Sequence, residues 1–191
     1  MPAFLLEENH MRCEWANSSE EMQSYHDNEW GKPSHDERLF FEMLTLEAAQ
    51  AGLSWATIIK RRETYRKAYD NFDVDKVATF DQAKRDALLQ DKGIIRNRLK
   101  VDSSIKNAKL IQEMHQHGEN FFEYIWNFVD NKPIINHYSD MSEMPAQTEL
   151  SQKISKDLKK RGFRFVGPTI IYSYLQAVGV INDHVDSCDF K

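Results

Sequence analysis

The feature that most constrains this chain is the helical spacing of its apolar residues, which continues through almost all of its 191 positions. Between residues 36 and 52, large apolar side chains recur every three or four positions, at Leu39, Phe40, Met43, Leu44 and Leu46. Such spacing lines one face of an α-helix. No segment shows the strict alternation of apolar and polar residues typical of a half-buried strand. We therefore predict an all-α fold.

Residues that favour helix ends mark the limits of the expected helices. Ser54 is a candidate N-cap, Pro168 suits a first helical turn, and Gly52, Gly162 and Gly179 favour helix ends. The chain between 131 and 145 is the longest irregular connection. The expected helices span residues 36–52, 55–72, 74–79, 82–90, 96–117, 120–129, 149–162 and 167–179.

Length and composition bound the class of protein. A chain of 191 residues forms one domain or two small ones, and its 41% hydrophobic content is that of a globular protein. No apolar run approaches the roughly 18 residues of a membrane span. The first ten residues, MPAFLLEENH, lack the basic segment of a secretory signal. We therefore expect a cytoplasmic protein that does not enter a membrane. As a separate expectation, which composition does not address, we take it to be a monomer.

The formal net charge is −5, but the charges are unevenly distributed. Lysine and arginine concentrate in residues 60–67, 96–100 and 156–165, whereas acidic residues dominate 1–47. An acidic protein with a local basic face can still bind a phosphate backbone. On charge alone, however, solvent-exposed helix surfaces explain these runs better than nucleic-acid binding does.

The two cysteines, Cys13 and Cys188, lie near opposite ends of the chain, and each has a histidine nearby, His26 and His184. In a helical turn, the spacing of His184 and Cys188 would place both side chains on one face. Two Cys/His pairs make a closed tetrahedral zinc site. A structural disulfide is disfavoured in a reducing cytosol. From spacing alone, a zinc site, a disulfide and unrelated residues all remain open.

Residues 88–105 combine a turn with a basic helix. Gly93 permits a tight turn after a short helix, and turn amides beside a helix N-terminus can hold a phosphate. Arg96, Arg98 and Lys100 add positive charge. The pattern is equally consistent with a helix–hairpin–helix, which binds DNA backbone without reading sequence, and with an ordinary helical hairpin.

Aromatic residues and one glutamate form the third set. Three of the four tryptophans lie within the first 55 residues, amid polar neighbours, and Glu47 lies in an otherwise apolar stretch. A carboxylate there must be exposed, paired or kept for a ligand. An aromatic slot with one carboxylate suits a flat base with N–H donors, although core aromatics and a solvated glutamate are the commoner case. The set is Trp15, Tyr25, Trp30, Glu47 and Trp55.

Several of these stretches together resemble 3-methyladenine DNA glycosylase I, the small zinc-containing branch of the helix–hairpin–helix DNA glycosylases. The resemblance extends in order from Met11 to Cys188, which leaves residues 1–10 as an N-terminal extension. One position departs from it, because Met22 stands where many members carry a tyrosine. The matching stretches are RCEW, YHDNEWGKP, FEML.LE..QAGLSW, DKGIIRNRLK and KKRGFRFVGPTIIYSYLQAVGVINDHV, followed by Cys188.

The resemblance implies a single domain with a helix–hairpin–helix at about 83–109, beside the base pocket. It implies one structural zinc ion that joins segments 11–35 and 167–191. The implied zinc ligands are Cys13, His26, His184 and Cys188. The implied base-binding residues are Trp15, Tyr25, Trp30, Glu47 and Trp55. The implied contacts to the DNA backbone are made by Gly93, Ile94, Ile95, Arg96, Arg98 and Lys100.

The implied reaction is hydrolysis of the N-glycosidic bond of N3-methyladenine in double-stranded alkylated DNA, with free 3-methyladenine as product and an abasic site left behind. Glu47 is the expected catalytic residue, which reads the flipped base and favours its departure electrostatically. No lysine stands out as a Schiff-base former, so we expect a monofunctional enzyme. A zinc hydrolase with an open metal position, and a DNA-binding protein without activity, are the alternatives.

Overall fold

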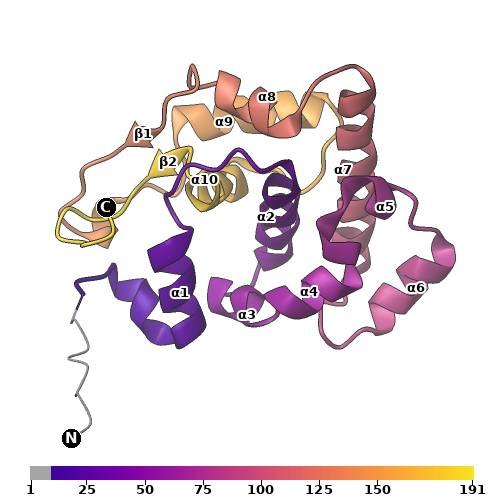
Figure 1. Cartoon of the computed structure of the whole chain (residues 1–191), viewed down its shortest axis with the longest axis horizontal. Helices are drawn as coiled ribbons and strands as arrows, with labels where there is room; N and C mark the ends of the chain where they lie inside the picture. The colour runs from indigo at the N-terminus through magenta and orange to yellow at the C-terminus, as the bar shows by residue number, and fades with distance from the viewer. Residues whose placement is uncertain (1–9) are drawn as a thin grey trace, which may run out of the picture.

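The computed structural model describes residues 10–191, and most of that length is helical (Figure 1). The expected extension at 1–10 lies outside the described residues except for His10. The short 3-10 helices are η1 (Glu14–Ser18), η2 (Asp70–Phe72) and η3 (Met141–Glu143). The α-helices are α1 (Glu20–Asn28), α2 (Glu37–Gln50), α3 (Trp55–Lys60), α4 (Arg62–Ala68), α5 (Val74–Ala78), α6 (Gln82–Gln90), α7 (Arg98–Gln116), α8 (Phe121–Asn127), α9 (Glu149–Lys160) and α10 (Pro168–Ala177).

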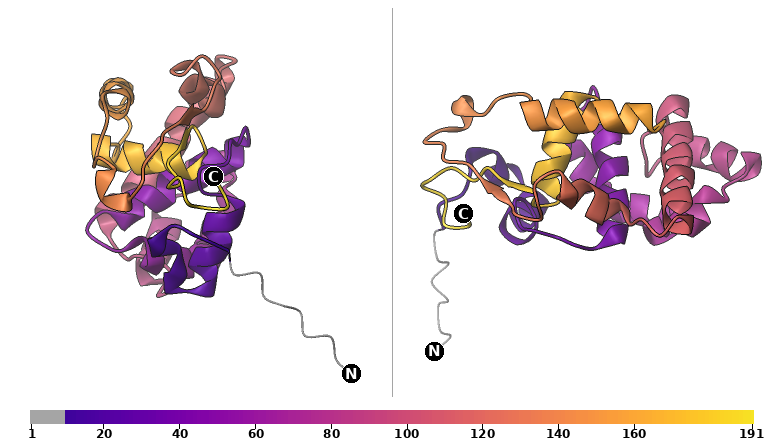
Figure 2. Two further views of the ribbon diagram at one scale, coloured as in Figure 1. Left: turned by 90° about the vertical axis from the view of Figure 1, so that its left-hand side faces the viewer. Right: turned by 90° about the horizontal axis from the view of Figure 1, so that it is seen from above.

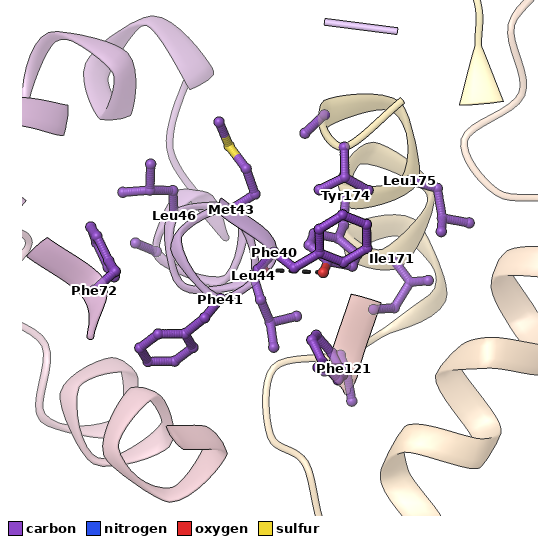
Figure 3. Packing of buried hydrophobic residues seen from close by; sticks show 14 of the residues in the cluster. Phe40, Phe41, Met43, Leu44, Leu46, Phe72, Phe121, Ile171, Tyr174 and Leu175 are labelled. Carbon is purple, nitrogen blue, oxygen red and sulfur yellow. Dashed lines mark hydrogen bonds between the residues drawn. The ribbon is translucent and has the colours of Figure 1, made fainter. Parts of the chain in front are cut away.

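Helix α2 is the centre of the fold. All ten residues from Phe40 to Ala49 are buried, so this helix is enclosed on every side. Its apolar side chains contact α10 and α8 on one side and the segment around Phe72 on another (Figure 3). The hydroxyl of Tyr174 on α10 donates to the Phe40 carbonyl at 3.1 Å. The carboxylates at Glu42 and Glu47, within this buried stretch, therefore lie inside the protein.

The helix caps explain where several helices begin and where one expected helix divides. Ser54 accepts from the Thr57 amide at 3.2 Å, which confirms it as an N-cap. The single helix expected over 55–72 is two helices, α3 and α4, separated at Arg61. The guanidinium of Arg61 donates to the Lys92 carbonyl at 2.8 Å, and Thr64 donates to the Gly93 carbonyl. The break therefore coincides with contacts that hold the 91–97 turn.

Two short strands depart from the all-α expectation. β1 (Ile134–Ile135) and β2 (Ile181–Asn182) pair in parallel, with Ile134 opposite Ile181. The Ile134 amide donates to the Val180 carbonyl at 2.9 Å. Two residues are too few to show a period-2 pattern, which is why the sequence carried no sign of them. The fold remains helical, and the strand pair joins the irregular 131–145 connection to the C-terminal segment.

The chain's first described residues lie beside its C-terminal segment (Figure 2). The Met11 amide donates to the Asp189 carboxylate at 2.8 Å, and the Asp189 amide donates to the Met11 carbonyl at 2.9 Å. The helical turn expected at His184 and Cys188 is instead a non-helical turn, in which the Cys188 amide donates to the Val185 carbonyl. No helix within residues 10–191 is both long and apolar enough to cross a membrane.

Candidate functional site

A cavity of about 330 Å³ opens between α1, α2, the start of α3, the η3 segment and α10. Every member of the predicted aromatic and acidic set lines it, so the structure brings that whole set together. Met22, the position that departs from the family pattern, also lines the cavity. The lining residues are Trp15, Met22, Tyr25, Trp30, Glu47, Gln50, Trp55, Met141, Met144, Pro145, Ala146, Thr169, Tyr172, Ser173 and Gln176.

The aromatic rings of the cavity contact one another in a chain. The ring centroids of Tyr25 and Trp55 are 5.5 Å apart, and those of Trp15 and Trp30 are 5.1 Å apart. Trp15 also lies 6.2 Å from Tyr25. These are the separations of stable tilted and edge-to-face pairs, so the rings hold one another in place. The cavity therefore presents fixed aromatic walls to a flat ligand.

Among the described residues that line the cavity, Glu47 is the one with a carboxylate side chain. Its side chain is 4% exposed, and its Oε2 atom has no hydrogen-bond partner among the residues that the structure describes. Burial raises the pKa of its carboxyl to about 8. Of the three options for this residue, burial excludes exposure, and Oε2 has no partner within residues 10–191. An unpaired buried carboxyl is costly to the fold, which is the expected signature of a group kept for a ligand.

Sequence reasoning missed the wall of the cavity that α10 provides. Thr169, Tyr172, Ser173 and Gln176 all line the cavity, and their spacing of three, one and three residues places them on one face of that helix. The signal was present as a polar stripe on an otherwise apolar helix. Behind this wall, the buried Asp183 carboxylate accepts from the Tyr172 hydroxyl, and from Gln176 Nε2 at 2.8 Å.

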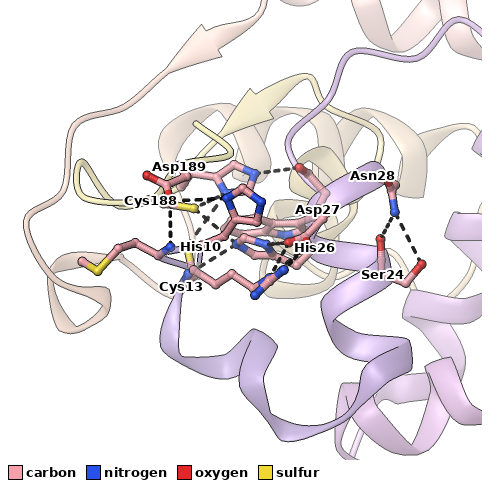
Figure 4. A network of polar contacts seen from close by, with 12 residues as sticks. His10, Cys13, Ser24, His26, Asp27, Asn28, Cys188 and Asp189 are labelled. Carbon is pink, nitrogen blue, oxygen red and sulfur yellow. Dashed lines mark hydrogen bonds and ion pairs between the residues drawn. The ribbon is translucent and has the colours of Figure 1, made fainter. Parts of the chain in front are cut away.

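The four predicted metal ligands meet in one buried cluster. Figure 4 labels three of them, Cys13, His26 and Cys188, which lie close together. The ligand atoms of Cys13, His26, His184 and Cys188 all lie within 4.8 Å of one another. The Cys188 sulfur is 3.3 Å from His184 Nδ1 and 3.6 Å from His26 Nε2. Four tetrahedral ligands with metal bonds of about 2.0–2.3 Å lie about 3.3–3.8 Å apart. The cluster could therefore hold one metal ion with little movement.

Contacts around the cluster orient both imidazole rings toward its centre. His26 Nδ1 lies 2.8 Å from the Asp27 carboxylate, which is itself bound by two nitrogens of Arg12. His184 Nε2 lies 2.9 Å from the Trp30 carbonyl. Because each ring donates through one nitrogen to an outer acceptor, the other nitrogen offers its lone pair to the cluster. Such outer hydrogen bonds are typical of histidines that bind metals.

Burial sets the protonation of the donor atoms. It lowers the pKa of His184 to about 4, which leaves that imidazole neutral at physiological pH. It raises the pKa of the Cys13 thiol to about 12. A bound cation would stabilise the thiolate that burial disfavours, so two sulfurs and two neutral imidazoles fit a divalent ion that accepts mixed sulfur and nitrogen ligands.

Trp30 joins the cluster to the cavity. Its ring lies 4.7 Å from the His184 ring and 6.0 Å from the His26 ring, while its other neighbours line the cavity. Trp15 likewise lies 5.2 Å from the His26 ring. The order of the cavity wall therefore depends on the order of the four-residue cluster.

The turn between α6 and α7 has a different internal structure from the one expected. The amides of Gly93, Ile94 and Ile95 donate to the Asp91 side chain, the Asp91 carbonyl and the Tyr65 hydroxyl. These amides are therefore already bonded within the protein, whereas exposed turn amides were expected. A Cβ atom on Gly93 would lie 2.8 Å from Thr64 Cβ, so close packing against α4 explains this glycine.

The basic side chains after the turn differ in their surroundings. Arg96 and Arg98 are exposed. Lys100 is partly buried, and its ammonium donates to the carbonyls of Ala49 and Ala51 at 2.8 and 2.7 Å. Lys100 thus binds the C-terminal end of α2. The exposed positive charge of the turn comes from Lys92, Arg96 and Arg98.

The Methyladenine glycosylase family model matches residues 15–191 of this chain. The DNA-3-methyladenine glycosylase of Haemophilus influenzae is 45% identical over 180 residues, which cover 94% of this chain and 97% of that protein. The DNA-3-methyladenine glycosylase 1 of Escherichia coli is 47% identical, over 93% of this chain and 95% of its own length.

Solved structures agree with the sequence matches. The structure of 3-methyladenine DNA glycosylase I from Staphylococcus aureus, determined to explain its recognition of 3-methyladenine, superposes with a TM-score of 0.90. That comparison covers 94% of this chain and 96% of the other, at 32% identity. The aromatic cavity, the buried glutamate and the sequence matches agree, and this chain belongs to the methyladenine glycosylase family.

Proposed function

We propose that this protein is a DNA glycosylase that hydrolyses the N-glycosidic bond of N3-methyladenine in double-stranded alkylated DNA and releases free 3-methyladenine. The observation that carries the proposal is Glu47, whose buried carboxyl faces an aromatic cavity and has an oxygen without a hydrogen-bond partner among the described residues. The names of the relatives support the same substrate.

The energetics of base capture are consistent with this site. Flipping a base out of the duplex costs a few kcal/mol, and less for a damaged pair. Stacking on an aromatic wall such as Trp55 returns about 1–3 kcal/mol, and a hydrogen bond to a charged carboxylate adds about 1.5–3 kcal/mol. Because these terms nearly balance, a base that cannot satisfy Glu47 returns to the duplex. Trp15, Tyr25 and Trp30 complete the walls that hold the base.

Glu47 is the proposed catalytic residue, and its role is electrostatic. An N3-alkylated adenine in DNA carries a positive charge, which favours the ionised carboxylate that burial otherwise disfavours. Alkylation already makes the base a good leaving group, so little general acid catalysis is needed. We assign Glu47 to reading the base and favouring its departure, and assign no nucleophile. The enzyme is monofunctional on this proposal and leaves an abasic site without cutting the strand.

The metal in the Cys/His cluster is proposed to be one zinc ion bound by Cys13, His26, His184 and Cys188. When bound, zinc supplies a closed four-ligand centre that ties segments 11–35 and 167–191 together and leaves no position for a catalytic water. The chain's own residues do the rest: Asp27 and the Trp30 carbonyl hold the two imidazoles in the required orientation.

The hairpin between α6 and α7 is the proposed contact with the DNA backbone, as in the helix–hairpin–helix superfamily. The proposed contacts are Gly93, Ile94, Ile95, Arg96, Arg98 and Lys100. Of these six residues, Arg96 and Arg98 have exposed side chains and would supply most of the charge. Binding of this kind is independent of base sequence and weakens with salt. We also propose that the enzyme acts as a monomer in the cytoplasm.

The direct test is release of bases from methylated DNA. Purified, metal-replete protein is incubated with DNA treated with a methylating agent, and the released bases are separated by chromatography. We expect release of 3-methyladenine, little release of 7-methylguanine, and intact DNA strands. The Glu47→Gln variant should release 3-methyladenine about 100-fold more slowly than wild type. No release of 3-methyladenine by the folded protein would remove the proposal, and full activity of the variant would remove the role of Glu47.

A further inference from the structure

A second buried carboxylate, Asp183, lies directly behind the α10 wall of the cavity. Its side chain is fully buried and is not itself part of the cavity lining. Oδ2 accepts from the Tyr172 hydroxyl, and from Gln176 Nε2 at 2.8 Å. Oδ1 accepts from Asn136 Nδ2 at 2.7 Å. Two of these three donors, Tyr172 and Gln176, belong to residues that line the cavity.

The contact with Asp183 occupies the side-chain hydrogen-bond donor of Tyr172. A phenol carries one hydroxyl hydrogen, and a carboxylate can only accept. Since that hydrogen is directed to Asp183, the Tyr172 oxygen can offer a ligand only its lone pairs. Burial and the Asp183 carboxylate both raise the pKa of Tyr172, so the phenol keeps its hydrogen.

The same contact fixes the amide of Gln176. A flipped amide would place Oε1 against the Asp183 oxygen, and two acceptors repel. Nε2 is therefore held on the Asp183 side, and Oε1 extends from the opposite side of the amide carbon. Gln176 is thereby set to accept hydrogen bonds at the cavity. Without Asp183, the amide would be free to turn and present its donors.

The strand pair that the sequence did not predict holds Asp183 in this position. Asn136 follows β1, and its backbone amide donates to the backbone carbonyl of Asn182 in β2 at 3.0 Å. This register brings the Asn136 side chain to Asp183, the residue after β2. The carboxylate is therefore fixed from both sides, by the strands and by α10.

We infer that Asp183 sets the hydrogen-bond polarity of the base cavity and so makes it selective for adenine over guanine. With the donors of Tyr172 and Gln176 directed to Asp183, neither side chain offers the cavity a hydrogen-bond donor, and Glu47 becomes an acceptor when the cationic base ionises it. Adenine offers an amino group at position 6, whereas guanine offers a keto oxygen there. Asp183 is thus a positioning residue for specificity, and the inference rests on the proposed glycosylase function.

The test measures a ratio of products, which a general loss of structure would not change. Wild type and Asp183→Asn are compared for release of 3-methyladenine and 3-methylguanine from the same methylated DNA. Asparagine has the same shape but offers its own N–H donors, so Tyr172 or Gln176 can turn a donor to the cavity. We expect the ratio of 3-methyladenine to 3-methylguanine release to fall about tenfold. Equal loss of both activities, or an unchanged ratio, would overturn the inference.

Two additional measurements keep the outcome interpretable. Asp186→Asn is the matched control, because it makes the same change on the same segment at a half-exposed carboxylate that does not line the cavity. We expect it to keep the wild-type ratio. Gln176→Met is the second variant if Asp183→Asn does not fold. The affinities of this variant for free 3-methyladenine and free 3-methylguanine are measured by quenching of tryptophan fluorescence. The ratio of the two affinities should be about tenfold smaller than in wild type. An unchanged difference would overturn the inference.

The outcomes also separate this inference from the proposed function. If wild type releases no methylated base, the glycosylase proposal fails, and the affinities for the two free bases still test the cavity's polarity. If wild type releases 3-methyladenine and the Asp183→Asn ratio stays at the wild-type value, only the role of Asp183 fails.

Discussion

The two buried glutamates of α2 lie five residues apart in opposite surroundings. Glu42 accepts from Arg62 Nε at 2.6 Å, from Arg66 Nε at 2.8 Å and from Arg38 Nη1 at 2.9 Å. Glu47 lies among aromatic rings, and its Oε2 atom has no partner among the described residues. Both side chains are almost completely inaccessible to solvent. Burial alone therefore does not decide what a carboxyl on this helix does.

The pKa shifts of the two carboxyls show the consequence. Burial acts to raise the pKa of Glu42, but Arg62 and Arg66 outweigh it, and the net pKa is lowered. For Glu47 burial acts without opposition and raises the pKa to about 8. Because the break at Arg61 starts α4, the α4 residues Arg62 and Arg66 reach Glu42. The N-terminal half of α2 is therefore bound to α4 through this carboxylate. In the C-terminal half of α2, Glu47 keeps a carboxyl group available for a ligand.

Removal of the proposed zinc ion is the largest perturbation we expect, because the ion would bind four buried polar side chains that otherwise lack a common partner. Treatment with a strong chelator should lower the melting temperature by about 10–20 °C. Calorimetry with and without added zinc measures the change. A melting temperature that stays constant while bound zinc is lost would contradict a structural role for the cluster.

Glu42→Gln should be the most destabilising single change at the paired end of α2. It leaves Arg62 and Arg66 partly buried without their shared carboxylate, and we expect a loss of about 3 kcal/mol in the free energy of unfolding. Chemical denaturation measures it. The control is Glu63→Gln, which removes an exposed partner of Arg66 and should cost less than about 1 kcal/mol. Equal costs would mean that burial at Glu42 adds nothing.

Glu47→Gln should show the opposite sign and a distinct dependence on pH. In the unfolded chain the carboxyl ionises near its ordinary pKa of 4.5, whereas in the folded chain it keeps its proton until about pH 8. Wild-type stability therefore falls relative to the variant as pH rises from 4.5 to 8. The difference should reach on the order of 4 kcal/mol at pH 8. A difference that is independent of pH would show that Glu47 is not held protonated.

Lys100 offers the smallest and most local test. Its ammonium caps the Glu47 end of α2 through the carbonyls of Ala49 and Ala51, so Lys100→Met should cost about 1 kcal/mol of stability. Arg98→Met is the comparison, and it should reduce the slope of log affinity for DNA against log salt by about 1. If Lys100→Met reduces that slope equally and leaves stability unchanged, its main contact is a phosphate.

Much of this architecture followed from local patterns in the sequence. Helix α2, the Ser54 cap, the aromatic cavity and the four-residue cluster were predicted from spacing, capping chemistry and family resemblance, and the structure brings their residues together. Such features depend on signals that repeat along one segment or on motifs that relatives share.

The features that were missed depend on contacts between distant segments. The strands β1 and β2 have two residues each, and their paired residues lie 47 positions apart in the sequence. No periodic pattern in the sequence therefore predicts them. The division at Arg61 follows from its contact with Lys92, and the bonded turn amides follow from Asp91 and Tyr65. Asp183 could be linked to the cavity only once α10 and the C-terminal segment were seen together.

The most direct test of the contrast between the two glutamates is a titration of both carboxyl groups by carbon-13 NMR, with Glu42→Gln and Glu47→Gln used to assign the signals. We predict that Glu47 titrates near pH 8 and that Glu42 titrates below its ordinary pKa of 4.5. If both carboxyls titrate near 4.5, Glu47 is solvated or paired in the free protein, and its proposed role as the waiting acceptor for the base is wrong.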